Sequence, residues 1–169
     1  MYAGYDMPAV NAKSVRELRL EIEEFHTEYC NTLDRGALEE WPDFFTEDAV
    51  YRVTARENAD AGLPVGLVYA DSKAMLRDRA FAIKHTQMFA PRYMQHLVTN
   101  VRVIAAPPGA IKAQSNYLLL QTLVDGPTTI HQSGRYFDTF MRDGARLLLK
   151  ERQCVYDTLL IANDLVYPV

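Results

Sequence analysis

The chain has 169 residues, 49% of them hydrophobic and 24% charged, a composition that fits a globular domain and excludes a disordered or collagen-like chain. The net charge is -4, from 18 Lys and Arg against 22 Asp and Glu. No run of basic residues is long enough to bind along a phosphate backbone, so we expect no nucleic-acid partner. The sequence has neither a signal-peptide pattern nor a run of about 18 apolar residues, so we expect a cytoplasmic protein with no membrane partner.

The first residues differ from the rest of the chain. Residues 1–13 contain Gly4 and Pro8 and show no hydrophobic period, which predicts an N-terminal arm. The patterns of regular structure begin at residue 14 and continue to the last residues. We therefore expect a single domain over residues 14–169.

A long helix is predicted to follow the arm. Ser14 and Glu17 form the S-x-x-E pattern of a capping box, which predicts a helix start at Ser14. Gly36 is typical of a residue just beyond a helix end. The apolar stripe between them, at steps of three and four, consists of Val15, Leu18, Ile22, Phe25, Tyr29 and Leu33.

The middle of the chain alternates short elements. In chain order the patterns predict a short helix over residues 37–45, a strand over 50–54, a loop over 56–64 and a strand over 65–69. Asp71 or Ser72 is then expected to cap a third helix. One side of that helix is expected to carry Met75, Leu76, Arg79 and Ile83.

The second half of the chain has the pattern of an antiparallel sheet. Its four β-rich runs cover residues 95–105, 110–124, 128–141 and 145–158. The short connectors between them are centred on glycine, which predicts hairpins and a meander. Strands this long twist and curl, and the helices earlier in the chain can cover the concave face. The expected fold is therefore α+β, a cone with the first helix across its mouth.

The last two strands carry apolar residues on both faces. Leu147 and Leu149 alternate with Leu148, which is also apolar. A sheet with one face in water alternates more cleanly, so this pattern predicts that another surface covers the outer face. Uneven patterning of a curved sheet is the alternative interpretation.

The sequence predicts no metal, disulfide or nucleotide site. Cys30 and Cys154 lie far apart, which gives neither a disulfide framework nor a thiolate cluster. The glycine-rich motifs for phosphates and dinucleotides and the G-x-S-x-G hydrolase motif do not occur. The histidines also lack the spacing of metal ligands; they are His26, His85, His96 and His131.

Acid–base chemistry inside the cone is the remaining catalytic hypothesis. Asp34, Tyr51 and His96 could meet at a shared cavity, because a helix across a curled sheet brings its last turn near the strand ends. Such a set suits proton abstraction beside a carbonyl, or dehydration. The simpler interpretation is structural: a turn hydrogen bond for Asp34, strand packing for Tyr51 and a satisfied histidine at 96.

Several segments, in order, resemble the small (beta) subunits of Rieske-type aromatic-ring-hydroxylating dioxygenases. The resemblance covers about residues 25–169, and Gln95 departs from it, since an arginine is more usual there. That departure puts in question any polar contact an arginine would make. The matching segments are Glu40–Tyr51 (EWPDFFTEDAVY), Arg56–Asn58, Gly62–Pro64, Met75–Arg79 (MLRDR), Arg92–His96, Asn100–Val103, Ser115–Tyr117, Glu151–Arg152 and Tyr156–Thr158.

The resemblance implies a fold and a role. The fold would be a cystatin-like cone, similar to nuclear transport factor 2 and ketosteroid isomerase. The role would be that of a structural beta subunit in aromatic compound catabolism, nearest to oxygenases acting on aromatic acids of the salicylate, terephthalate or anthranilate type. The partner would be a large alpha subunit carrying the Rieske 2Fe-2S cluster and the mononuclear iron, within an alpha3beta3 hexamer whose beta subunits associate as a trimer. This chain itself would then hold no cofactor and no catalytic residue.

Two other hypotheses stay open. One is a stand-alone isomerase or dehydratase of the same cone fold that uses Asp34, Tyr51 and His96. The other is a binding cone for small molecules without catalysis. The subunit hypothesis predicts a filled cone, and the large side chains expected to fill it are Phe25, Tyr29, Trp41, Phe44 and Tyr51.

Overall fold

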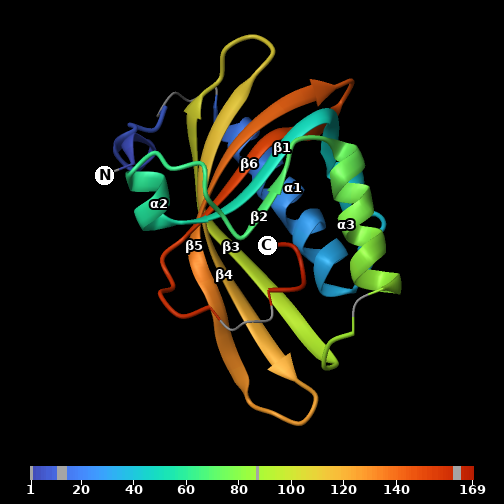
Figure 1. Ribbon diagram of the computed structural model, residues 1–169. Helices are drawn as coiled ribbons and strands as arrows, with labels where there is room; N and C mark the ends of the chain where they lie inside the picture. Colours follow the sequence, from blue (N-terminus) through green and yellow to red (C-terminus); the bar gives the residue numbers. More distant parts are fainter. Residues whose placement is uncertain (1, 11–14, 87, 162–164) are drawn as a thin grey trace.

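The protein is a long, strongly curved sheet with helices on one face (Figure 1). The computed structural model describes residues 2–10, 15–86, 88–161 and 165–169. In this part of the chain the sheet has six strands in the order β2-β1-β6-β5-β4-β3. The strands are β1 (Phe45–Ala55), β2 (Val68–Ala70), β3 (Arg92–Ala105), β4 (Ile111–Leu123), β5 (Thr128–Asp143) and β6 (Arg146–Tyr156). The helices are α1 (Arg16–Asp34), α2 (Arg56–Asp60) and α3 (Lys73–His85), with 3-10 turns at Ala3–Asp6 and Trp41–Phe44.

The predicted meander is confirmed. Strands β3, β4, β5 and β6 pair in sequence, each antiparallel to the next. Gly109 and Gly144 take positive φ angles of 85° and 60° in the turns between these strands, a conformation that glycine adopts without strain. Helices α1 and α3 lie on the concave side (Figure 1). The α+β cone expected from the sequence is therefore the observed fold.

Strand β1 is longer than predicted and pairs in an unexpected way. It begins at Phe45, five residues before the predicted start, and runs parallel to β6, with Val50 opposite Glu151. The alternation of the segment by itself gives no sign of a partner so distant in the sequence. Pairing with β6 extends the strand into the region where a short helix over residues 37–45 was predicted, and only the 3-10 turn at Trp41–Phe44 remains of that helix.

Smaller differences concern helix ends and one loop. Part of the predicted loop over 56–64 forms the short helix α2, and β2 starts at Val68 rather than at residue 65. Helix α2 is too short for a hydrophobic period to reveal it. Helix α1 ends at Asp34, just before Gly36, as predicted, and begins at Arg16. The expected capping residue Ser14 lies outside the described residues.

Helix α3 is capped by Ser72, whose hydroxyl accepts a hydrogen bond from the Met75 backbone N–H at 3.4 Å. The buried face of this helix only partly matches the prediction. Met75 was expected on that face but is 42% exposed. The side chains that the helix buries are Lys73, Leu76, Ala80 and Ile83.

The cone is filled by side chains. Tyr29, Trp41 and Tyr51 are fully buried, as predicted, while Phe25 and Phe44 are half-buried and pack against the core. Aromatic rings pack against one another among aliphatic side chains, and the Trp41 ring lies nearly perpendicular to the Tyr51 ring at a centroid distance of 5.3 Å. The sequence did not predict the charged groups that the same interior also buries, described below.

The N-terminal residues pack on the outer face of the sheet. The rings of Tyr2 and Tyr5 meet the ring of Phe137 on β5 edge to face, at centroid distances of 5.0 and 5.3 Å. The guanidinium groups of Arg56 and Arg135 lie over the Tyr5 ring at 4.4 and 4.7 Å. Part of the outer face is therefore covered by the chain itself. Among the described residues, no helix has the length and apolar character needed to span a membrane.

Candidate functional site

Two of the three predicted site residues are in direct contact. Asp34, the last residue of α1, lies beside His96 on β3, with Oδ1 at 2.6 Å from the ring Nδ1. Both carboxylate oxygens also accept from the His96 backbone N–H at 3.1 Å. The other ring nitrogen, Nε2, faces the Pro168 main-chain oxygen at 3.2 Å. Each nitrogen of the His96 ring therefore lies within hydrogen-bond distance of an oxygen of this chain.

Tyr51 lies deeper in the cone and has different partners. Its hydroxyl donates to the Val169 main-chain oxygen at 3.2 Å and accepts from the Val169 N–H at 2.9 Å. Burial raises the pKa of Tyr51 well above its ordinary value. The predicted shared cavity of Asp34, Tyr51 and His96 is therefore occupied by residues 168 and 169, which link His96 to Tyr51.

An open groove runs beside the Asp34–His96 pair. It lies between α1 and β3 and has a volume of about 610 Å³. The His96 side chain, however, is only 1% exposed, and its Nε2 is bound to Pro168, so the ring is not available from the groove. Asp34 is 26% exposed and is the acidic group of the pair that faces solvent.

The strongest electrostatic feature of the cone is a salt bridge that the sequence did not reveal. Arg152 on β6 donates Nε–H and Nη2–H to the two oxygens of Asp138 on β5, at 2.9 and 2.8 Å. The Arg152 side chain is fully buried, and that of Asp138 is 1% exposed. The guanidinium group lies between the rings of Tyr29 and Tyr136, at 4.2 and 4.1 Å from their centroids. Burial raises the pKa of Asp138, and the bidentate arginine opposes this effect.

His26 on α1 completes this network. Its Nδ1 accepts from Arg152 Nη2 at 3.1 Å, and its Nε2 faces the Ser115 hydroxyl at 3.4 Å. Because arginine can only donate, Nδ1 must be unprotonated, and the ring is the neutral Nε2–H tautomer. Burial, followed by the Arg152 charge, lowers the pKa of His26 well below its ordinary value. The network thus fixes α1 across the sheet through a neutral histidine.

A signal for this network was present in the sequence. Asp138 stands between Tyr136 and Phe140 at a spacing of two, so a regular strand places all three on one face. A carboxylate in the middle of an aromatic inward face requires a buried cation. The hydrophobic pattern alone does not show which arginine supplies it, and β6 meets β5 with Arg152 directly opposite Asp138.

The neutral His26 makes the stability of the protein depend on pH. The unfolded chain takes up a proton at this histidine near the ordinary pKa of 6.5, while the folded chain does not. We therefore expect the free energy of unfolding to fall as the pH decreases below about 6.5, by at most about 1.4 kcal/mol per pH unit for this one group. The profile is obtained from urea unfolding at pH 7, 6 and 5.

The matched variant is His26→Gln, whose amide oxygen can still accept from Arg152. It is expected to show a flatter profile than the wild type over the same range. Equal slopes for the wild type and His26→Gln would contradict the assignment.

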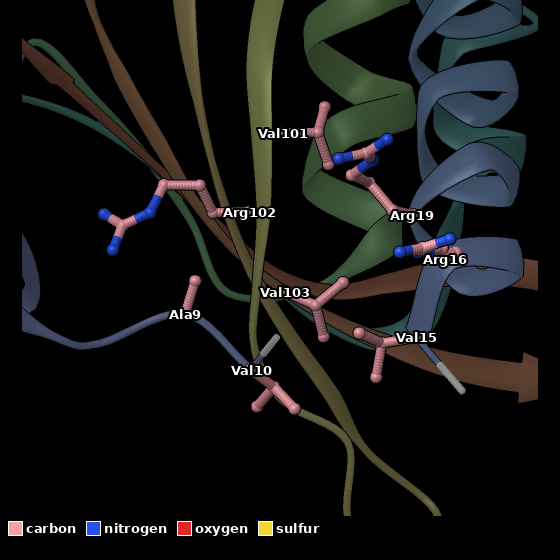
Figure 2. Close-up of a pocket in the computed structure, with 8 residues that line it drawn as sticks. All are labelled: Ala9, Val10, Val15, Arg16, Arg19, Val101, Arg102 and Val103. Atoms are coloured by element: carbon pink, nitrogen blue, oxygen red, sulfur yellow. The ribbon is translucent and has the colours of Figure 1, made fainter. Parts of the chain in front are cut away.

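A second hollow, of about 440 Å³, lies where the N-terminal segment meets β3 (Figure 2). Arg16 and Arg19 of α1 lie on one side of β3, while the Arg102 side chain extends on the other (Figure 2). Arg102 donates to the Gln114 side-chain oxygen at 3.0 Å and to the Met7 main-chain oxygen at 2.9 Å. The guanidinium groups therefore do not converge on one anion site.

The described residues contain no group of three or more His, Cys, Asp or Glu side chains placed to hold a metal ion. Both cysteines are buried. Burial raises the pKa of the Cys30 thiol to about 12 and also raises that of Cys154, so neither is a thiolate near neutral pH. The chemistry this arrangement offers is hydrogen bonding and charge pairing within the chain.

Comparison with known proteins identifies the family. Residues 29–163 match the family described as the ring hydroxylating beta subunit. The chain is 36% identical over 149 residues to the anthranilate 1,2-dioxygenase small subunit of Burkholderia cepacia, covering 88% of this chain and 92% of that protein. It is 31% identical over 150 residues to subunit beta 2 of the terephthalate 1,2-dioxygenase terminal oxygenase component of Comamonas sp., covering 89% of this chain and 97% of that protein. A solved beta subunit described as belonging to an aromatic-ring-hydroxylating dioxygenase of Novosphingobium aromaticivorans matches with a TM-score of 0.85 and 36% identity, covering 93% of this chain and 100% of that chain. The chain therefore belongs to the family of beta subunits of aromatic-ring-hydroxylating dioxygenases.

Proposed function

We propose that this chain is the structural beta subunit of a Rieske non-haem iron oxygenase that acts on an aromatic acid. Two relatives named as small or beta subunits support this, since anthranilate and terephthalate are both aromatic acids. The observation that carries the structural role is the filled interior. Arg152, Asp138 and Tyr51 are at most 3% exposed, and all three are bonded within the chain.

The catalytic metals belong, in this proposal, to a large alpha subunit that carries the Rieske 2Fe-2S cluster and the mononuclear iron. The described residues of this chain do not fit either group, because they bring no three potential ligands together. The role of the beta subunit is structural: it associates as a trimer in a cytoplasmic alpha3beta3 hexamer and holds the large subunits in fixed positions relative to one another.

Exposed apolar side chains support a partner surface. Exposed apolar residues that lie close together mark interfaces more often than free surface. One group precedes and enters β2 and consists of Leu63, Val65, Leu67 and Tyr69. A second group, on β3, β5 and the end of β4, consists of Tyr93, Leu97, Leu123, Val124 and Ile130.

The first test of this proposal is the metal content. We expect the purified chain to contain no stoichiometric iron by elemental analysis and to consume no oxygen with an aromatic acid as substrate. Adding it to its large subunit is expected to give an active complex that elutes as one species. Stoichiometric iron in this chain alone, or full oxygenase activity of the large subunit without it, would refute the structural role.

The isomerase or dehydratase alternative has one observation in its favour, the 2.6 Å contact between Asp34 and His96. A general base needs a free nitrogen or oxygen directed at substrate. In this structure His96 Nε2 faces the Pro168 main-chain oxygen at 3.2 Å, and the Tyr51 hydroxyl is hydrogen-bonded to Val169, so neither is directed at an open cavity. The geometry therefore favours the structural subunit.

A further inference from the structure

The last residues of the chain occupy the mouth of the cone in the manner of a bound peptide. Figure 1 shows the C-terminal residues between the sheet and helices α1 and α3. Side chains on four separate elements lie within hydrogen-bond distance of their main-chain oxygens. Arg79 of α3 donates to Val166 at 3.1 Å, and His96 of β3 lies 3.2 Å from the oxygen of Pro168. The hydroxyls of Tyr29 on α1 and Tyr51 on β1 lie 3.1 and 3.2 Å from the oxygen of Val169.

The side chains of the segment are bound as well. Val169 is fully buried and belongs to the core cluster, and the Cys154 sulfur lies 3.8 Å from its main-chain oxygen. The ring of Tyr167 packs edge to face on Phe89 at 5.5 Å. The segment is thus held by polar contacts along its backbone and by an apolar pocket at its last residue.

The walls of this site are held by contacts that do not involve the segment. The Trp41 indole N–H donates to the Tyr29 hydroxyl at 2.8 Å, and Asp34 fixes the ring of His96. Tyr51 is fixed by strand pairing, opposite Ala70 on one side and Arg152 on the other. Removal of the segment would take away the partners of these groups in the segment, while the contacts that hold the walls would remain.

We propose that the mouth of the cone is a preformed binding site for an apolar peptide and that residues 165–169 are its built-in ligand. The polar side chains recognise main-chain oxygens, and the apolar surroundings of Val169 select a small aliphatic side chain at that position. This inference goes beyond the proposed subunit role, and its test uses this chain alone, apart from the iron and oxygen-uptake measurements that test that role.

The test uses the full chain and displaces its own segment. In Val169→Asp, a carboxylate replaces the valine in the apolar pocket, which expels the segment. Trp41, the only tryptophan of the chain, donates to Tyr29 and so reports on the site. We expect red-shifted tryptophan emission in this variant. Titration with the N-acetylated peptide Leu-Val-Tyr-Pro-Val is expected to reverse the shift with saturable 1:1 binding, while the same peptide ending in Asp binds at least about 100-fold more weakly.

Two further substitutions in the Val169→Asp background identify the site. Tyr51→Phe removes a donor and is expected to weaken peptide binding several-fold, up to about tenfold. Tyr117→Phe is the matched control, because this buried hydroxyl donates to Gln132 at 2.6 Å and does not touch the segment. It is expected to leave the peptide affinity unchanged.

The milder variant Val169→Gly covers the case in which Val169→Asp does not fold. It removes only the aliphatic side chain of residue 169. The added peptide then competes for the site with a segment that binds there less tightly. Absence of saturable binding to whichever variant is folded would overturn the proposal. Failure of both variants to fold would also overturn it, because the walls of the site would then depend on the segment and would not be preformed.

Discussion

Asp138→Asn is expected to lower the free energy of unfolding by about 3–5 kcal/mol, the usual loss when one partner of a buried ion pair is removed. Arg152 would keep its charge in a fully buried position with no anion beside it; one of its two bonds would be lost, because an amide nitrogen cannot accept, and the other would be weakened. The ring faces of Tyr29 and Tyr136 offset only part of this loss. Urea unfolding followed by circular dichroism at neutral pH measures the effect.

The chain offers a matched control on its surface. Glu21 and Arg142 also form a bidentate pair, through Nη1 and Nη2 of the arginine at 2.7 and 2.6 Å, but both side chains are partly exposed. Glu21→Gln is expected to cost less than about 1 kcal/mol, because water screens the exposed pair. Similar losses in the two variants would show that burial does not determine the strength of the Arg152–Asp138 pair.

A double variant separates the penalty of a broken pair from the value of the intact one. Replacing Arg152 by Met and Asp138 by Leu removes both charges together and is expected to recover most of the stability lost in Asp138→Asn. If the double variant is as unstable as the single one, then the pair itself, with its bonds to His26, stabilises the fold.

Leu148→Asp is expected to leave the isolated chain folded and to weaken its assembly with the large subunit by at least about 100-fold, since an interface would bury an unpaired carboxylate. The structure places Leu148 on the outward face of β6, half-buried, between the inward Leu147 and Leu149. Its neighbour across the β5–β6 ladder is Met141, so the outer face is apolar at this point. Sedimentation of the mixed subunits gives the affinity.

Leu149→Asp is the control for register. Leu149 is fully buried, so this variant is expected to unfold rather than to dissociate. Loss of soluble, folded protein in Leu148→Asp would instead place Leu148 in the core. Undiminished assembly of that variant would show that this face of the sheet is not an interface.

The parts of the fold that depend on short-range chemistry were predictable from the sequence. Glycine turns at residues 109 and 144 specify hairpins, and the hairpins specify the meander. The parallel pairing of β1 with β6 was not predictable, because it joins strands that no local turn connects. Only the tertiary contact decides where β1 begins.

The candidate site shows the same division. The contact between Asp34 and His96 was predictable because the end of a helix across a cone meets the edge of the sheet. The partner of Asp138 was not, since it depends on the register between β5 and β6. The role of residues 168 and 169 was also missed, because two residues after the last strand carry no periodic pattern.

The position of β1 between β2 and β6 has a consequence for synthesis on the ribosome. The ladder pairs Val50 with Glu151, so β1 cannot pair with β6 until about 100 further residues have been synthesised. Their synthesis takes roughly 5–20 s at ordinary rates of elongation. Meanwhile the β3–β5 hairpins can form, but β1 and β2 have no strand through which to join them. Termination before Arg146 therefore leaves two separate pieces of sheet, β1–β2 and β3–β5, rather than a smaller cone.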